Sequence, residues 1–180
     1  MITNYSSRKI KSKLDICFDA NESIIINLVK INEIELKNFR NFKNNKFLFN
    51  SKSNIFYGNN GSGKTNILES VSIIGKGRGI RNANISDLIK NKEENFLIKS
   101  MLEINNNNYD VQVYTKQVGN KINKIISVNN DQSSESKNIL KSKLSYLIFL
   151  PEMERLFQSS PSYRRNFIDR LIFSEKNDYN

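Results

Sequence analysis

The clearest chemistry in the sequence lies in eight consecutive residues, GNNGSGKT, at positions 58–65. They match the pattern G-x-x-x-x-G-K-[ST], in which a glycine-rich backbone turns its N–H groups inward and forms a nest for phosphate oxygens. The lysine of this pattern reaches the β- and γ-phosphates of a nucleotide, and the final hydroxyl binds Mg²⁺. We therefore predict a site for ATP and Mg²⁺, with Lys64 as the phosphate contact and Thr65 as the magnesium ligand. The candidate binding residues are Gly58, Asn59, Asn60, Gly61, Ser62, Gly63, Lys64 and Thr65.

The flanks of this segment distinguish a phosphate-binding loop from an ordinary glycine-rich turn. The apolar run NIFYG at 54–58 predicts a short strand that leads directly into the loop. Apolar residues then recur at helical spacing, which predicts a helix over 64–75. Its expected apolar stripe consists of Ile67, Leu68, Val71 and Ile74. Because a strand, a glycine loop and a helix follow one another in the order that the motif requires, the phosphate-binding interpretation is favoured.

The rest of the chain is predicted to add an antiparallel β layer to this strand–helix core. Period-two alternation and β-branched or aromatic residues predict strands at 31–39, 46–49, 96–104, 109–116 and 121–128, with hairpin turns at 105–108 and 117–120. A short helix is predicted at 85–90, a polar loop at 129–138, a helical turn at 139–144, a buried strand at 146–150, and a last helix capped by Ser160 with Pro161 in its first position. The expected fold class is α/β.

The charge of the chain suggests polyanionic partners. Lys and Arg number 28 against 18 Asp and Glu, which gives a formal charge of +10 and a pI near 9.6. A basic balance of this kind favours nucleic-acid binding, because phosphate contacts dominate that affinity. The chain is also rich in Lys, Asn and Ile, residues that AT-rich codons favour, so codon bias is an alternative source of the charge.

Several function classes are excluded by residues that the chain lacks. Histidine is absent and Cys17 is the only cysteine, which excludes histidine-based catalysis, a cysteine zinc site and an internal disulfide. The longest apolar runs, such as IIINLV at 24–29, are too short to cross a bilayer, and the amino end does not resemble a secretory signal. A cytoplasmic protein is therefore expected.

The second acidic half of a nucleotide site is not evident in the sequence. Phosphate-loop proteins also place an acid at the end of a second buried strand, where it holds Mg²⁺ or polarises water. The closest match is YLIFLPE, in which Pro151 separates the apolar run from Glu152. We interpret Glu152 as misplaced for Mg²⁺.

Four blocks together resemble one family. ELKNFRNF (35–42), NIFYGNNGSGKTNILES (54–70), GKGRGIR (75–81) and LPEMERLFQSSPSYRRNFIDRL (150–171) follow the order and spacing of RecF, the bacterial recombination mediator of the ABC/SMC-like ATPase class. The wording of the last block looks most like the alphaproteobacterial branch. The resemblance implies a P-loop NTPase fold, specifically the N-terminal lobe of an ABC-ATPase-like head with an antiparallel β layer.

The resemblance also implies roles for several arginines and one lysine. Arg40 would lie near the bound nucleotide, and its alternative is a solvated residue at a strand end. Just past the loop helix, Lys76, Arg78 and Arg81 would meet nucleotide or DNA, and their alternative is an exposed turn. In the last helix, Arg164 and Arg165 oppose the helix dipole, which hints at a bound phosphate or an acidic partner. Their alternative is a salt bridge to Glu152 or Glu154.

At the level of the whole protein, the resemblance implies an ATP-binding protein of DNA replication and recombinational repair. It would bind single-stranded or junction DNA, form an ATP-dependent homodimer and work with RecO and RecR.

Family members continue with a helical arm, a signature Ser-Gly segment and an apolar strand ending in Asp, none of which this sequence contains. We therefore interpret residues 31–180 as a truncated RecF-like ATP-binding lobe and 1–30 as an extension, either disordered or an added strand. ATPase activity is expected only of a complete head. The alternatives are a non-functional fragment and a small P-loop kinase, which Pro151 and the antiparallel middle disfavour.

Overall fold

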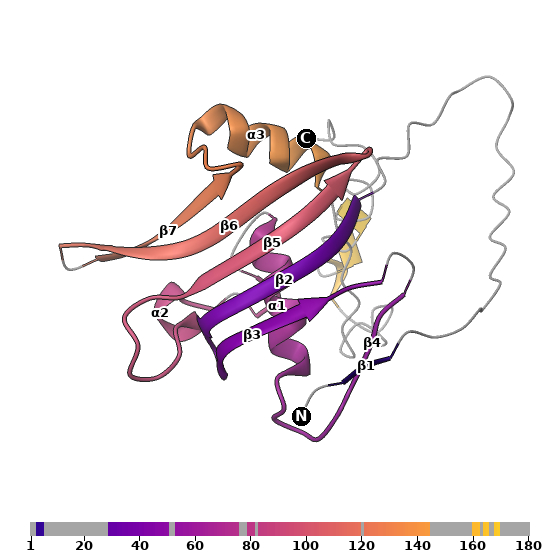
Figure 1. Cartoon of the computed structure of the whole chain (residues 1–180), viewed down its shortest axis with the longest axis vertical. Helices are drawn as coiled ribbons and strands as arrows, with labels where there is room; N and C mark the ends of the chain where they lie inside the picture. The colour runs from indigo at the N-terminus through magenta and orange to yellow at the C-terminus, as the bar shows by residue number, and fades with distance from the viewer. Residues whose placement is uncertain are drawn as a thin grey trace, which may run out of the picture.

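The computed structural model describes residues 3–5, 29–50, 53–75, 79–81, 83–119, 121–144, 160–162, 164, 165, 168 and 169. Its main body is a five-stranded antiparallel sheet in the order β3-β2-β5-β6-β7, which crosses Figure 1 diagonally. These strands are β2 (Val29–Phe39), β3 (Phe42–Leu48), β5 (Leu97–Ile104), β6 (Asn107–Val118) and β7 (Lys121–Val128). The described residues also form the helices α1 (Lys64–Ile74), α2 (Ile85–Leu88) and α3 (Ser134–Lys143). The antiparallel layer expected from the sequence is therefore confirmed.

Alternating side chains give this sheet one buried face. Ile34, Leu36 and Ile98 are fully buried, and Val111 and Val113 of β6 continue the same face, against which α1 packs. Successive side chains of a strand point to opposite faces, so every second residue of β2, β5 and β6 faces the helices. This period of two is why the sequence pattern located these strands correctly.

Two tight hairpins join β5, β6 and β7. Asn105 and Asn106 both have positive φ, at 50° and 65°, in the turn that pairs Ile104 with Asn107. Asparagine tolerates this backbone region better than most residues, and paired positive φ values match the twist of the flanking strands. The turns predicted at 105–108 and 117–120 are confirmed, and the second turn contains Gly119 at φ 59°.

The strand that precedes the glycine loop lies outside the five-stranded sheet. β4 (Ile55–Tyr57) pairs in antiparallel register with β1 (Thr3–Tyr5), which comes from the segment interpreted as an extension. The two-stranded β1–β4 ribbon appears at the lower right of Figure 1. The side chains of Ile55 and Tyr57 remain 52% and 50% exposed.

Helix α1 confirms the predicted element, although its apolar stripe differs from the prediction. Ile67, Ile73 and Ile74 are buried, whereas Leu68 is 49% exposed, so its predicted place in the stripe is wrong. Polar residues occupy the buried positions instead, because the structure gives each of them a partner. Ser70 and Ser72 donate to the carbonyl oxygens of Ile67 and Glu69, both at 2.6 Å, and the partners of buried Glu69 are described below.

The polar loop predicted over 129–138 is wrong in its second half. Helix α3 begins at Ser134, and the Ser133 hydroxyl caps it by accepting from the N–H of Ser136 at 3.1 Å. Asp131 accepts hydrogen bonds from the hydroxyls of Ser133 and Ser136, and the bond from Ser136 is the main reason that the pKa of Asp131 falls from its ordinary 3.8 to about 2. The first helical turn is polar throughout, so it carries no apolar periodicity, and its N-cap was the available signal.

The last predicted helix is described in part. Residues 161, 162, 164, 165, 168 and 169 have helical backbone, and the N–H of Arg164 bonds to the carbonyl of Ser160 at 3.2 Å, in agreement with the predicted start. The strand predicted at 146–150 and Glu152 lie outside the described residues. No helix in the described part of the chain is long and apolar enough to cross a membrane.

Candidate nucleotide-binding site

The glycine loop joins the end of β4 directly to the start of α1. Gly63 is the N-cap of α1 and has φ 105°. A Cβ atom at Gly63 would lie 2.6 Å from Phe42 Cζ and 2.8 Å from Asn41 Nδ2, distances that real Cβ atoms do not show. Both the backbone angle and the close approach of the β2–β3 turn therefore require glycine at this position.

Lys64 lies within the curl of the loop. Its ammonium donates to the carbonyl oxygens of Gly58 at 2.7 Å and Asn59 at 2.9 Å, and the N–H of Ser62 bonds to Asn59 O at 3.2 Å. The first turn of α1 contains no acidic residue, so no carboxylate there offsets the positive end of the helix dipole. A lysine charge and a helix N-terminus thus converge where the sequence predicted a phosphate site.

Two hydroxyls flank this position. The Ser62 hydroxyl is buried without a hydrogen-bond partner among the described residues, and a buried hydroxyl in that state costs about 1–3 kcal/mol until it finds one. Thr65 is exposed in the first turn of α1. An unsatisfied hydroxyl, the open space beside Gly61 and a lysine inside the loop fit a nucleotide phosphate group. The described residues contain no cluster of three or more acidic, cysteine or histidine side chains that could hold a metal by themselves.

Arg40 lies beside the loop in a strong ion pair. Its Nε and Nη2 donate to the two carboxylate oxygens of Glu69 at 2.9 and 2.8 Å, and its Nη1 donates to the backbone carbonyl of Asp87 at 2.8 Å. The side chain is 19% exposed and that of Glu69 is fully buried. The alternative of a solvated residue at a strand end is therefore wrong. The next residue, Asn41, contacts the loop itself through Ser62 O at 3.2 Å.

Arg81 lies near the same carboxylate group, that of Glu69. Its Nη1 lies 3.6 Å from Glu69 Oε2 and donates to Asn66 Oδ1 at 3.0 Å, while its side chain remains 47% exposed. Arg40 and Arg81, which the sequence suggested separately, thus meet at Glu69, a residue that the sequence reasoning missed. Lys76 and Arg78 lie outside the described residues.

The two arginines of the last helix, Arg164 and Arg165, make hydrogen bonds within that helix. The N–H of Arg164 belongs to the helical hydrogen bond to Ser160, and Arg165 Nε donates to Pro161 O at 3.4 Å. Their predicted salt-bridge partners, Glu152 and Glu154, lie outside the described residues, so the role of this pair stays a prediction.

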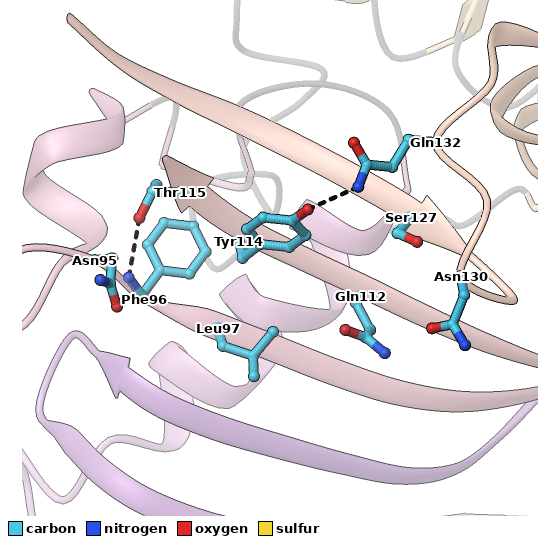
Figure 2. A pocket seen from close by; sticks show the side chains of 9 residues that line it. All are labelled: Asn95, Phe96, Leu97, Gln112, Tyr114, Thr115, Ser127, Asn130 and Gln132. Carbon is cyan, nitrogen blue, oxygen red and sulfur yellow. Dashed lines mark hydrogen bonds between the residues drawn. The ribbon is translucent and has the colours of Figure 1, made fainter. Parts of the chain in front are cut away.

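A cavity opens on the sheet, and no residue of the glycine loop lines it (Figure 2). Its volume is about 440 Å³, and its lining consists of Asn95, Phe96, Leu97, Gln112, Tyr114, Thr115, Ser127, Asn130 and Gln132. Figure 2 shows two hydrogen bonds within it, from Gln132 Nε2 to the Tyr114 hydroxyl and from the N–H of Phe96 to Thr115 Oγ1, both at 3.0 Å. No charged side chain lines the cavity, so it lacks the chemistry of a phosphate site.

The fold and the loop define a P-loop NTPase, specifically the N-terminal lobe of an ABC-ATPase-like head. Residues 30–154 match the family model described as "RecF/RecN/SMC N terminal domain". The chain therefore belongs to the RecF/RecN/SMC N-terminal domain family, and the resemblance seen in the sequence is confirmed.

Individual relatives agree with this assignment. The DNA replication and repair protein RecF of Rickettsia massiliae (strain Mtu5) is 35% identical over 145 residues, which cover 80% of this chain and 39% of the relative. That of Rickettsia felis (strain ATCC VR-1525 / URRWXCal2) is 34% identical over 145 residues, covering 80% and 38%. The chain thus spans about two fifths of the length of these relatives.

Solved structures give the same result. The recombination mediator protein RecF-ATPrS in the RecFOR pathway matches with a TM-score of 0.66 and 28% identity, over 82% of this chain and 39% of that one. The RecF-ATP structure of the same pathway matches with a TM-score of 0.63 and 29% identity, over 86% and 42%. The ABC-ATPase-like lobe expected from the sequence is therefore confirmed.

Proposed function

We propose that this chain is an ATP-binding lobe of a RecF-type DNA replication and repair protein. The observation that carries the proposal is the loop of residues 58–63 curled around the Lys64 ammonium at the N-terminus of α1. The names of the similar proteins, RecF with ATP among them, point in the same direction.

Binding would involve the loop N–H groups and the side chains of Ser62, Lys64 and Thr65. Lys64 exchanges its bonds to the carbonyls of Gly58 and Asn59 for bonds to the β- and γ-phosphates, and the loop N–H groups donate to the remaining phosphate oxygens. The buried Ser62 hydroxyl gains the partner that it lacks. Thr65 would hold Mg²⁺ through its hydroxyl, and the ion would supply positive charge to the bound phosphates.

Binding of the triphosphate is tested by calorimetric titration of the chain with ATP and Mg²⁺, and with AMP as the comparison. We expect heat from ATP and none from AMP, because the loop addresses the β- and γ-phosphates. Equal weak heats for both nucleotides, or none for either, would contradict an assembled loop and favour the non-functional fragment.

DNA is the second partner that we propose, with RecO, RecR and an ATP-dependent homodimer as partners of the whole protein. The support is the charge of +10 and the names of the relatives. Binding is expected to be independent of sequence and to weaken steeply with salt through counterion release. Replacing Arg78 and Arg81 with Ala should lower the slope of log K against log salt by up to about one per lost phosphate contact. An unchanged slope would remove these arginines from the DNA surface.

Hydrolysis by this chain is not expected. Loop residues stabilise bound phosphate, but turnover also needs charge stabilisation and a positioned water in the transition state. The one acid near a second apolar run, Glu152, follows Pro151. Release of phosphate by the purified chain, lost in both Lys64→Ala and Glu152→Gln, would show instead that Glu152 takes part.

A further inference from the structure

Glu69 is the most deeply buried charged residue of the described chain, and it lies one turn along α1 from the phosphate loop. Its side chain is fully buried, and both carboxylate oxygens accept hydrogen bonds from Arg40. Burying a carboxylate costs several kcal/mol unless its partners are well placed. The bidentate geometry supplies such partners, so the pair holds the β2–β3 turn in one position relative to α1.

The pair belongs to a ring of polar residues that reaches the loop and closes through the backbone between Arg40 and Asn41. Asn41 follows Arg40 in the turn, and its amide donates to Ser62 O at 3.2 Å and accepts from Asn66 Nδ2 at 2.9 Å. Asn66 in turn accepts from Arg81 at 3.0 Å, and Arg81 returns to Glu69 at 3.6 Å. The five members are Glu69, Arg40, Asn41, Asn66 and Arg81, named here the Glu69 ring.

The Glu69 ring lies against the most constrained point of the loop. The Asn41 amide and the Phe42 ring occupy the space beside the Gly63 Cα, which leaves no room for a Cβ atom there. Arg40 itself has φ 52°, a backbone region that non-glycine residues seldom adopt. A turn in this conformation needs an anchor, and the Glu69 carboxylate provides one through the Arg40 side chain.

We propose that Glu69 is a positioning residue of the phosphate loop: it acts through Arg40 and Asn41 to hold the Ser62–Gly63 backbone in its binding conformation. The proposal rests on the nucleotide-binding function given above. An amide at position 69 would offer one acceptor oxygen in place of two, and its NH₂ group would face an arginine donor.

The first test compares Glu69→Gln with a matched control, Glu103→Gln. Glu103 of β5 forms a part-buried ion pair with Lys30 of β2 at 2.7 Å, and none of its described contacts involves the loop. In the full chain, Glu69→Gln is expected to weaken ATP binding roughly 10- to 100-fold, whereas Glu103→Gln leaves it within about twofold, as expected for groups that do not share partners. Equal ATP affinities in the wild type and Glu69→Gln would overturn the proposal.

A double-mutant cycle with Asn41→Ala separates positioning from general support of the fold. Asn41 is exposed, and its removal leaves the Glu69–Arg40 pair in place. If Glu69 acts through Asn41, the double variant binds ATP about as weakly as the poorer single variant. Affinity losses that multiply would show that Glu69 supports the fold alone, and would overturn the proposal.

Amide hydrogen exchange without nucleotide keeps this test independent of the proposed function. Peptides covering residues 58–66 are expected to exchange faster in Glu69→Gln and in Asn41→Ala, with peptides of β7 unchanged. Exchange at 58–66 that equals the wild type in both variants would overturn the proposal, even for a chain that does not bind ATP. If Glu69→Gln does not fold, Asn41→Ala alone decides the matter by the same measurement.

Discussion

The loop side of the molecule and the β5–β6–β7 meander are built by opposite means. The meander joins neighbours in sequence through tight hairpins, and its inner face is apolar, with Ile98, Val111 and Val113 fully buried. The loop side joins segments 21 to 47 residues apart through polar side chains, among them Arg40, Asn41 and Glu69. The meander therefore depends on burial, whereas the loop depends on geometry that distant partners impose.

Lys64→Ala is expected to give the largest effect and to fall on the loop side alone. Charge-assisted hydrogen bonds contribute about 1.5–3 kcal/mol each, so losing two to phosphate weakens ATP binding by about 3–6 kcal/mol, beyond ordinary detection. The stability of the sheet is expected to stay close to that of the wild type. Calorimetry and urea unfolding measure the two quantities, with Lys116→Ala at an exposed position of β6 as the control. ATP binding that survives Lys64→Ala would refute the loop assignment.

Ile98→Ala is expected to do the reverse. Ile98 is fully buried in β5, and truncating such a side chain to Ala costs about 2–5 kcal/mol of unfolding free energy. The ATP affinity of the molecules that remain folded should be unchanged, since Ile98 belongs to the apolar core and is not a member of the Glu69 ring. Urea unfolding and titration at low temperature measure this. A parallel loss of affinity would mean that the two regions are not separable.

Gly63→Ala tests whether close packing against the β2–β3 turn matters for the loop. The added methyl meets Phe42 and Asn41 below 3 Å and also strains a φ of 105°, so we expect about 1–3 kcal/mol of overpacking beyond the backbone strain, and weaker ATP binding. Gly61→Ala is the matched control, because its φ of 80° carries the strain while nothing lies within 4 Å. Thermal melting and ATP titration of both variants test this. Equal effects in the two variants would show that close packing at Gly63 is unimportant.

The smallest of the expected effects is the loss of stability at the N-cap of α3 in acid. The pKa of Asp131 is depressed to about 2 in the folded chain, so its contribution to stability is present above its ordinary pKa of 3.8 and is lost as pH falls toward 2. Asp131→Asn is therefore expected to flatten the fall of stability between about pH 4 and pH 2, as followed by far-ultraviolet circular dichroism. An unchanged pH profile would place the acid sensitivity elsewhere.

The sequence was sufficient for the elements that repeat a short period. The alternation in β2, β5, β6 and β7, the asparagine turn at 105–108 and the strand–loop–helix order around Gly63 each express local rules, and the structure confirms them. The start of α3 was missed because its first turn is polar on every side. Leu68 was misplaced because a helical period does not reveal which polar residues will acquire buried partners.

The Glu69 ring could not have been predicted from the spacing of residues alone. Glu69 reads in the sequence as an ordinary charged position of a surface helix, and its two arginines lie 29 residues before it and 12 residues after it. Burial of a charge depends on where those partners arrive in space, which is a tertiary property. The one local hint was that a predicted helix of small and apolar residues contained a single acid.

The pairing of β1 with β4 has a consequence for how the chain opens. About 50 residues separate these strands, whereas two separate β5 from β6, and by loop-closure entropy the longer connection costs roughly 3 kcal/mol more to close. Each strand of this ribbon is three residues long, so few ladder bonds offset that cost. The β1–β4 ribbon is thus expected to be the least protected unit in a partial-unfolding experiment, separating under mild denaturant while the meander stays intact. Since β4 leads into the glycine loop, nucleotide affinity would then fade before the protein loses its secondary structure.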